Sequence, residues 1–440
     1  MSKPTFKDLN LNTPIFNALE ELGFEHPTPI QERAFSTMMS GADVVGIAQT
    51  GTGKTVAYLL PCLRLWQFSK NKVPQVLILV PTRELVVQVV DEIIKLSKYM
   101  NVSALGVYGG ANIRTQRAEV LKGCDFLVAT PGRLLDLILD GTLKTKSIKK
   151  VVIDEVDEML DLGFRPQLER VFDLLPPKRQ TLMFSATLSD EVDAIINTFF
   201  ISPLRIEAAP VGSPLENISQ SAYEVPNHHT KLNLLSYLLE QDGMDKVLLF
   251  AGSRKLADQL YEYLEVEFPG EAGVIHSNKA QNTRFMAVEN FSQGKHRILI
   301  ATDILSRGID ISGVSHVINF DIPETPENYI HRIGRTGRAD KKGIAISLIK
   351  EKELEMVGKI EDLMSMKIPR EQMHEDVEIS EKLTLDEMPK INMPGSKVKP
   401  RNYTPGPAFH EKKDKNKKVN VRKTRAQQMR EKYNKPRRKG

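Results

Sequence analysis

The stretch VVGIAQTGTGKT, Val44 to Thr55, decides the fold of the first half of the chain. A short apolar run that suits a buried strand leads into a glycine-rich turn, and an apolar helical pattern follows. Glycines allow backbone N–H groups to turn inward around an anion, and the start of the next helix adds partial positive charge. In this geometry Lys54 reaches the β- and γ-phosphates of a nucleotide, and the Thr55 hydroxyl can ligate magnesium. The stretch therefore predicts a phosphate-binding loop, although Ala48 stands where the generic pattern has glycine.

A second strand pattern ends in clustered negative charge. VVIDEVDEML, Val151 to Leu160, places Asp154 and Glu155 directly after β-branched residues. Beside a phosphate-binding loop, a carboxylate at a strand end can hold the magnesium ion, and a neighbouring acid can orient or deprotonate the attacking water. We assign Asp154 to magnesium and Glu155 to the water. The alternative is a solvated helix start favoured by the helix dipole, and we keep that interpretation for Glu158.

Short apolar runs alternate with amphipathic stretches in two successive blocks. This alternation predicts the α/β class, with two mostly parallel sheets flanked by helices. The first block has expected strands at residues 43–48, 75–80, 126–129, 150–153 and 181–184, and an expected helix at 84–98. The second block has expected strands at residues 246–250, 272–275, 297–301, 316–320 and 343–349.

The composition of two segments sets the expected domain boundaries. Residues 208–217, AAPVGSPLEN, are rich in proline, glycine and serine, so we interpret them as a linker. The linker separates a first domain at residues 1–207 from a second at 218–368, and residues 369–440 form a C-terminal extension.

The extension is strongly basic towards its end. Residues 395–440 contain 17 Lys and Arg against 3 Asp and Glu, a net charge of +14, whereas the rest of the chain carries −9. So few apolar residues cannot bury enough surface to fold alone. We expect a disordered basic arm from about residue 395 that binds nucleic acid, with a merely solubilising tail as the alternative.

The overall composition is that of a globular protein. A hydrophobic fraction of 41% in 440 residues suffices for two or three packed domains. Cys62 and Cys124 lack the spacing of a zinc site, which favours a reducing compartment and buried thiols. No apolar run approaches the ~20 residues of a membrane span, and the N-terminus lacks the apolar segment of a signal peptide. These features predict a soluble, cytoplasmic protein.

Nine motifs follow one another at compatible spacings. They are GFEHPTPIQ (23–31), AQTGTGKT (48–55), PTREL (81–85), a Gly-Gly pair (109–110), TPGR (130–133), DEVD (154–157), SAT (185–187), ATDILSRGIDI (301–311) and HRIGRTGR (331–338). In this order they make roughly residues 5–365 resemble the DEAD-box ATP-dependent RNA helicases. The resemblance implies two tandem RecA-like domains.

The resemblance also implies ATP and Mg²⁺ as cofactors. Gln31 would read the adenine and Phe6 would stack on it, with a buried glutamine and a core phenylalanine as the structural alternatives. Arg335 and Arg338 would reach the γ-phosphate as arginine fingers, and Asp310 would bind the ribose. The phosphate-binding loop would contribute Ala48, Gln49, Thr50, Gly51, Thr52, Gly53, Lys54 and Thr55.

Two further sets of residues follow from the resemblance. Asp157, Ser185, Thr187 and His331 would couple the nucleotide site to the RNA site, although polar residues at strand ends are often only turn formers. The RNA-binding set lies in loops and helix starts, whose N–H groups and arginines suit phosphates. Because no base-reading constellation is present, we expect backbone and 2′-hydroxyl contacts without sequence preference. The set comprises Pro81, Thr82, Arg83, Gly109, Gly110, Thr130, Pro131, Gly132, Arg133, Arg284, Thr302, Arg307 and Gly308.

The sequence departs from the family pattern at two positions. Val156 replaces the alanine of the family's name, and Ser277 stands where glycine is common after His276. Two added methyl groups beside a packed strand cost on the order of 1–3 kcal/mol unless the neighbouring pocket is adjusted. Since the carboxylates on either side of Val156 are intact, we expect an active enzyme.

Three functions remain open at this point. They are an RNA-unwinding ATPase, a slow ATP-gated RNA clamp or assembly scaffold, and a DNA translocase of related fold. Intact Glu155, Arg335 and Arg338 favour the first over the second, and the adenine-reading segment favours it over the third. By analogy with compact bacterial relatives we expect a monomer that acts on RNA in ribosome assembly or RNA decay, with ribosomal precursors or decay proteins as partners and no membrane contact.

Overall fold

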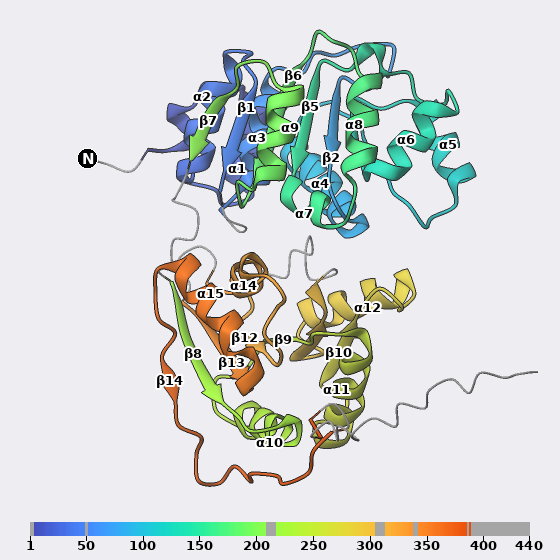
Figure 1. Cartoon of the computed structure of the whole chain (residues 1–440). Helices are drawn as coiled ribbons and strands as arrows, with labels where there is room; N and C mark the ends of the chain where they lie inside the picture. The colour runs from blue at the N-terminus through green and yellow to red at the C-terminus, as the bar shows by residue number, and fades with distance from the viewer. Residues whose placement is uncertain are drawn as a thin grey trace, which may run out of the picture. The chain divides into compact units, whose positions relative to one another are not determined.

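The computed structural model describes residues 4–48, 52–207, 217–303, 313–337, 342–384 and 387–388. Within these residues, each half of the chain holds a sheet of seven strands, and every strand pair is parallel (Figure 1). Parallel strands need long crossover connections, and helices supply them in both halves. The expected α/β class with two mostly parallel sheets is confirmed.

The first sheet has the order β3-β4-β2-β5-β6-β1-β7. Its strands are β1 (Val44–Ile47), β2 (Val76–Leu79), β3 (Ala104–Val107), β4 (Phe126–Ala129), β5 (Lys150–Asp154), β6 (Gln180–Ser185) and β7 (Leu204–Glu207). The accompanying helices are η1 (Phe6–Asp8), α1 (Thr13–Glu21), α2 (Pro29–Met39), α3 (Lys54–Arg64), α4 (Arg83–Leu96), α5 (Ile113–Lys122), α6 (Pro131–Leu139), η2 (Thr145–Ser147), α7 (Val156–Asp161), α8 (Arg165–Leu174) and α9 (Asp190–Phe199).

The second sheet has the order β10-β11-β9-β12-β13-β8-β14. Its strands are β8 (Ile218–Glu224), β9 (Val247–Phe250), β10 (Ala272–Ile275), β11 (Ile298–Ala301), β12 (His316–Asn319), β13 (Gly343–Ile349) and β14 (Arg370–Glu371). Its helices are α10 (His228–Leu239), α11 (Arg254–Glu267), α12 (Gln281–Ser292), α14 (Pro326–Ile333), η3 (Glu351–Glu353) and α15 (Leu354–Met364).

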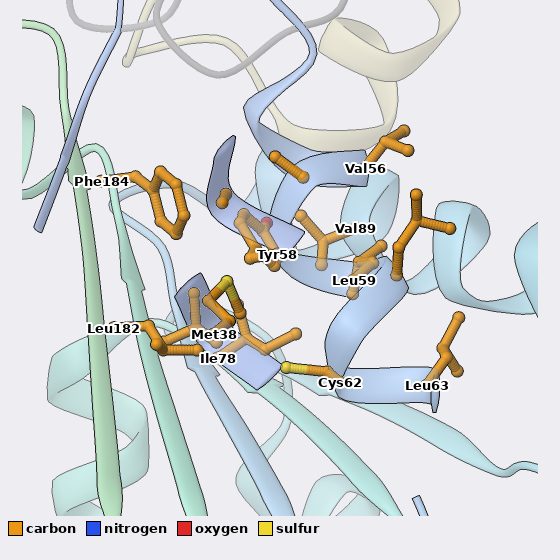
Figure 2. Close-up of a cluster of buried hydrophobic side chains, with 14 of the residues drawn as sticks. Met38, Val56, Tyr58, Leu59, Cys62, Leu63, Ile78, Val89, Leu182 and Phe184 are labelled. Carbon is orange, nitrogen blue, oxygen red and sulfur yellow. The ribbon is translucent and has the colours of Figure 1, made fainter. Parts of the chain in front are cut away.

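Alternating residues of the central strands supply two cores, one on each face of the first sheet. In β2, Val76 and Ile78 belong to one cluster, whereas Leu77 and Leu79 belong to the other. Figure 2 shows the first cluster, in which helix α3 packs its apolar face over the sheet. Each fully buried aliphatic side chain contributes about 1.5–3 kcal/mol. Packing on both faces therefore fixes the carboxyl ends of the strands, where the polar motifs lie.

The cysteines behave as apolar core residues. Cys62 and Cys124 are both free thiols and are buried. Burial raises the pKa of each to about 12, so neither thiol ionises at neutral pH.

None of the helices in the described part of the chain is both long and apolar enough to span a bilayer.

A segment after α15 completes the second sheet. We call residues 368–384 together with Glu387 the strap. Its β14 pairs with β8 at the sheet edge, Val377 is buried in the core, and the His374 ring stacks on Tyr237 at 5.2 Å between centroids. The linker prediction at residues 208–217 falls almost entirely outside the described residues, as does the basic arm from residue 395.

Candidate active site

The structure describes the phosphate-binding loop at Ala48, whose N–H donates to the Ser185 carbonyl at 3.0 Å, and again from Thr52, which leads into α3. Gly53 has φ +86°, a left-handed conformation that favours glycine, and a Cβ there would lie 2.4 Å from the Gln31 amide nitrogen. Lys54 is buried, and its Nζ has no hydrogen-bond partner among the described residues. A buried ammonium without a partner is costly. The loop is therefore built to place this cation against an anionic ligand.

Gln31 connects the start of α2 to this loop. Its Oε1 accepts a hydrogen bond from the Thr28 N–H at 3.0 Å, and its Nε2 donates to the Gly53 carbonyl at 3.2 Å. The Thr28 hydroxyl donates to the Thr52 carbonyl at 2.9 Å. Phe6 is buried beside Phe24, with ring centroids 6.5 Å apart. Gln31 lies in the first turn of α2, whereas the Phe6 N–H donates to the Glu25 carbonyl before that helix. The adenine contacts of Gln31 and Phe6 stay predictions.

Strand β5 ends at Asp154, and Glu155 turns the chain into α7. Glu155 has φ +53°, a left-handed conformation that costs a non-glycine residue about 1–3 kcal/mol. Both carboxylates are buried, and Asp154 Oδ1 and Glu155 Oε2 have no hydrogen-bond partner among the described residues. Val156 follows, fully buried in the core. The two acidic groups therefore lie at the carboxyl end of the central strand β5, and the buried core contact of Val156 helps to keep the chain in this strained conformation.

The acids next to Lys54 have different pKa values. Burial raises the pKa of Asp154, although the charge of Lys54 opposes this shift. Burial also raises the pKa of Glu155 to about 7, again against Lys54 and with a further contribution from Asp154. For Asp157, burial alone would raise the pKa, but His331, Lys54 and hydrogen bonds outweigh it and lower the pKa. Glu155 can therefore exchange a proton near neutral pH, as a general base requires, whereas Asp157 stays charged.

Asp157 accepts three hydrogen bonds from the segment that follows β6. Its Oδ2 receives the Ala186 N–H at 3.1 Å, the Thr187 N–H at 3.0 Å and the Thr187 hydroxyl at 3.0 Å. Ser185 is fully buried beside them. The structure therefore joins Asp157 to the SAT segment, as expected, and leaves the coupling role as a prediction.

The interpretation of Glu158 as a solvated helix-start residue is wrong. Only 3% of Glu158 is exposed, and its Oε1 lies 2.6 Å from His331 Nδ1. A buried carboxylate needs such a partner because its desolvation is unfavourable. His331, predicted to act with Asp157 in coupling, is therefore the partner of Glu158, and its charge also lowers the pKa of Asp157. Arg335 is also buried, and its charge acts on Glu155.

The expected RNA-binding residues of the first half lie at the ends of three adjacent strands. The Thr130 hydroxyl accepts a hydrogen bond from the Gly109 N–H at 3.3 Å, after β4 and β3 respectively. Gly110 has φ +79°, and a Cβ there would meet the guanidinium of Arg83, which follows β2. Arg133 donates to the Ala111 carbonyl at 3.0 Å. Pro81, Thr82, Pro131 and Gly132 belong to the same loops and helix starts.

Arg284 of α12 is paired with an acid. Its Nη1 lies 3.2 Å from Glu84 Oε1, and both side chains are buried. Gln281 donates to the same Glu84 oxygen at 3.1 Å and accepts from Arg83 at 3.3 Å. Thr302 is buried just after β11. The RNA-binding roles of Arg284 and Thr302 stay predictions.

Comparison with known proteins identifies the family. Residues 28–195 match the DEAD/DEAH box helicase family, and residues 230–340 match the helicase conserved C-terminal domain. The DEAD-box ATP-dependent RNA helicase RhpA of Helicobacter pylori is 37% identical over 390 residues, which cover 89% of this chain and 75% of RhpA. The corresponding CshA of Geobacillus kaustophilus is 38% identical over 366 residues, covering 83% of this chain and 78% of CshA. The chain belongs to the DEAD-box ATP-dependent RNA helicases.

A solved structure supports the same assignment. Dbp5 of S. cerevisiae, bound to RNA and ADP BeF3, is similar with a TM-score of 0.77 and 29% identity, over 84% of this chain and 95% of that one. The tandem RecA-like fold is thus confirmed for this DEAD-box helicase. As a family member it is an ATP-using, RNA-dependent ATPase and helicase.

Two residues of this DEAD-box helicase were missed by sequence reasoning. Arg332, the second residue of the HRIGR motif, is buried, and its guanidinium contacts Asp303 at 2.5 and 2.8 Å. Tyr58 of α3 is fully buried beside Asp154, and burial together with this negative charge raises its pKa well above the usual range. The arginine stood within a quoted motif, whereas nothing in the spacing of Tyr58 distinguishes it from a core residue.

Seven predicted site residues of this DEAD-box helicase lie outside the described residues. Their roles therefore stay predictions. They are Gln49, Thr50, Gly51, Arg307, Gly308, Asp310 and Arg338.

Proposed function

We propose that this helicase locally unwinds short RNA duplexes or remodels ribonucleoprotein, coupling ATP hydrolysis to the closure and reopening of two domains on single-stranded RNA. The observation that carries the proposal is the arrangement of three acids around the start of α7. Asp154 and Glu155 lie within the electrostatic reach of Lys54, and Asp157 holds the SAT segment. Hydrolysis and coupling would thus share one short stretch of backbone.

The residues beside the phosphate-binding loop fit a magnesium ion. Mg²⁺ takes few protein ligands, usually one or two oxygens, and completes its shell with phosphates and water. Asp154 offers a buried oxygen without a hydrogen-bond partner among the described residues, and Thr55 offers a hydroxyl at the start of α3. These two residues would hold the ion. When bound, the ion would neutralise charge that develops on the phosphates.

The chain's own residues would perform the remaining tasks. Lys54 would bind the β- and γ-phosphates, and Glu155 would orient the attacking water and accept its proton. Arg335 and Arg338 would stabilise charge on the transferred group. Gln31, Phe6 and Asp310 would select and hold the adenosine.

RNA would be held through its backbone by both halves. In the first half, the loops after β2, β3 and β4 contact one another and present N–H groups and arginines. In the second half, Arg284, Thr302, Arg307 and Gly308 would contribute. This arrangement supports recognition of phosphates and 2′-hydroxyls without sequence preference.

A strand-separation assay on short RNA and DNA duplexes tests the proposed function. We expect ATP-dependent separation of the RNA duplex and none of a DNA duplex of matched length and stability. ATP-dependent retention of RNA without separation would instead indicate a clamp, and separation of the DNA duplex would indicate a DNA translocase. Absence of RNA-stimulated ATP hydrolysis would overturn the proposal.

The basic extension is proposed to tether the enzyme to structured RNA. Truncation after Pro394 should weaken RNA binding about three- to ten-fold and make its salt dependence shallower, because the 17 basic residues beyond it would no longer release counterions. The kcat at saturating RNA should change by less than about two-fold. Filter binding across a salt series, together with steady-state ATPase assays, measures both quantities.

A matched control separates charge from length. In a full-length variant, the five lysines between residues 412 and 418 are replaced by glutamine. This variant should lose part of the RNA affinity and part of the salt dependence of RNA binding. An unchanged salt dependence would contradict the proposed tether.

We further propose a cytoplasmic monomer that acts in ribosome assembly or RNA decay. Crosslinking to cellular RNA would test the proposed pathway by identifying the bound RNA.

A further inference from the structure

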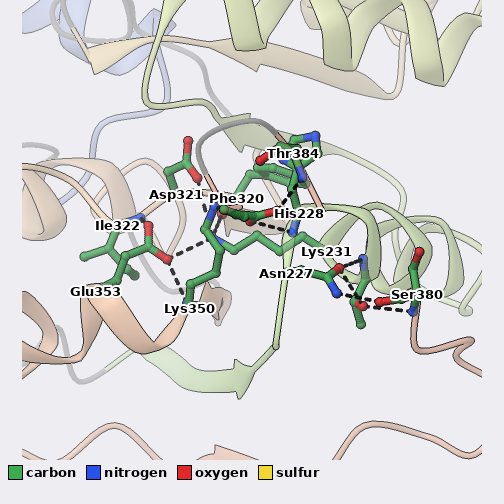
Figure 3. A network of polar contacts seen from close by, with 12 residues as sticks. Asn227, His228, Lys231, Phe320, Asp321, Ile322, Lys350, Glu353, Ser380 and Thr384 are labelled. Carbon is green, nitrogen blue, oxygen red and sulfur yellow. Dashed lines mark hydrogen bonds and ion pairs between the residues drawn. The ribbon is translucent and has the colours of Figure 1, made fainter. Parts of the chain in front are cut away.

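A lysine with no exposed surface lies at the centre of a polar network in the second half (Figure 3). Lys231 comes from α10, and its Nζ donates to the Phe320 carbonyl at 2.5 Å. The same Nζ lies 3.0 Å from Glu353 Oε2 and 3.5 Å from Asp321 Oδ1. Burial lowers the pKa of Lys231, and the two carboxylates oppose this shift. The lysine therefore joins α10 to the end of β12 and to η3.

Glu353 extends the network to the turn after β12. Its Oε1 accepts the Ile322 N–H at 3.2 Å, and its Oε2 accepts the Lys350 N–H at 2.8 Å. Asp321 in turn accepts the Gly252 N–H, after β9, at 3.1 Å. The turn at residues 321–322 is thus contacted by two charged side chains, Lys231 and Glu353, and by one backbone N–H, that of Gly252.

The same turn positions the buried arginine of the HRIGR motif. Arg332 Nη1 donates to the Asp321 carbonyl at 2.6 Å and to Asn319 Oδ1 at 3.2 Å. Its other nitrogens contact Asp303, directly after β11. Arg332 lies on α14 beside His331 and one turn before Arg335. A displacement of the turn would therefore move the part of the chain that carries both of these residues.

The strap ends on the same network. Glu387 Oε1 accepts the His228 N–H at 2.9 Å and lies 3.2 Å from Lys350 Nζ, while its Oε2 accepts the Thr384 N–H at 3.1 Å. Two residues further along α10, the Ser380 N–H donates to the Thr230 hydroxyl at 3.1 Å. These contacts fix the last described residues of the strap at the helix that carries Lys231.

We propose that Lys231 and Glu353 are positioning residues for Arg332, and that Glu387 fastens the strap to the network they form. Neither residue belongs to the proposed nucleotide or RNA contacts. Both contact the turn at residues 321–322, the turn contacts Arg332, and Arg332 contacts Asp303. The effect on turnover rests on the proposed function, whereas the effect on α14 does not.

A double variant separates this role from a purely structural one. Replacing both members of a buried ion pair is often neutral for stability, whereas replacing one leaves an uncompensated charge. Lys231→Met and Glu353→Gln should therefore each lower the melting temperature, and the double variant should recover part of that loss. If the pair only stabilised the fold, the ATPase activity of the double variant would recover together with its melting temperature. If the pair positions Arg332, the ATPase activity of the double variant would stay low.

The experiment measures RNA-stimulated ATP hydrolysis and amide hydrogen exchange on the full-length protein. In the double variant we expect kcat to fall about three- to ten-fold, with the KM for ATP within about two-fold of wild type. We also expect exchange in α14, residues 326–333, to accelerate about ten-fold in the absence of ligands. Glu387→Gln should show the same changes at smaller size.

The matched control is the exposed pair Lys359 and Glu355 on α15, whose charged groups lie 2.8 Å apart. Lys359→Met combined with Glu355→Gln should change neither kcat nor exchange in α14. A Lys231 and Glu353 double variant with wild-type kcat, or with unchanged exchange in α14, would overturn the proposal. A wild-type protein without RNA-stimulated activity would overturn the proposed function alone, because the exchange measurement would still decide the positioning role.

Discussion

Replacement of Glu155 by glutamine is expected to lower the kcat of RNA-stimulated ATP hydrolysis about 100-fold or more. Glutamine keeps the shape of the side chain but cannot accept a proton from water. Because Lys54 and the loop around Gly53 are untouched, ATP binding should stay within about three-fold of wild type. Single-turnover hydrolysis and fluorescent-nucleotide binding measure the two quantities. Strand separation that depends on turnover should be lost together with hydrolysis.

Because the pKa of Glu155 is raised, Glu155→Gln should also change how the free energy of unfolding depends on pH. Burial favours the neutral acid in the folded protein, so the associated stability is present below the ordinary pKa of 4.5 and is lost as the pH rises through about 7. Glutamine does not ionise and avoids this loss. The stability of the variant relative to wild type should therefore increase as the pH rises from about 5 to about 8, by more than about 1 kcal/mol. Denaturant titrations at both pH values measure the difference.

An exposed acid provides the control for both measurements. Glu191→Gln lies on the surface at the start of α9 and should change neither hydrolysis nor the pH dependence of stability. A Glu155→Gln variant that hydrolyses ATP within ten-fold of wild type would contradict the assignment of the general base. Equal stability differences at the two pH values would contradict the raised pKa.

The strands that were predicted consist almost entirely of apolar residues that are buried in the fold. Residues 126–129, 272–275 and 343–349 were predicted with the bounds that the structure has, and the other expected strands agree within one residue at either end. Strands buried on both faces of a parallel sheet form continuous apolar runs, which few other structures require. The phosphate-binding loop was predictable for a related reason, because only a strand, a glycine turn and a helix give that order of residue types.

Strands β3, β7, β8 and β14 were missed because they lack that signature. β7 is mostly exposed, the two residues of β14 are both exposed, and β8 alternates buried with exposed residues. β3 contains a glycine and is only partly buried at three of its four positions. For these strands, pairing with a neighbouring strand determines whether the segment becomes a strand, and the neighbour is distant in the sequence.

The same limit explains the error at Glu158. Its position after Asp157 is typical of a helix start, where the dipole favours acids in water. Its actual partner, His331, comes from the other half of the chain, and no spacing within VVIDEVDEML indicates it. The Lys231 network could not be predicted from the sequence for the same reason, because its members come from α10, η3, the strap and the residues that follow β12. Sequence patterns predict local elements and ligand-facing motifs, whereas buried polar pairs between distant segments need the folded structure.

Replacement of Asp157 by asparagine is expected to lower RNA strand separation about 30- to 100-fold. The carboxylate accepts two backbone N–H groups and the Thr187 hydroxyl through one oxygen, and burial makes each of these bonds stronger than in water. Asparagine lacks the charge that balances Lys54 and His331 and can turn an NH₂ group toward the N–H donors. A loss of about 2–3 kcal/mol of charge-assisted hydrogen bonding corresponds to this factor. Strand separation under excess enzyme measures it.

Substitutions of Thr187, whose hydroxyl donates to Asp157, test whether this hydrogen bond contributes to the coupling. Thr187→Ser keeps the hydroxyl and should retain strand separation within about three-fold, whereas Thr187→Ala removes one of the three hydrogen bonds and should lose about ten-fold. Because Asp154, Glu155 and Lys54 are unchanged in all of these variants, ATP affinity should be preserved. A variant Asp157→Asn that separates strands normally would show that its contact with the SAT segment serves folding only. Equal loss of ATP affinity and strand separation would place Asp157 in the nucleotide site itself, since a coupling residue affects the link between two sites more than either site alone.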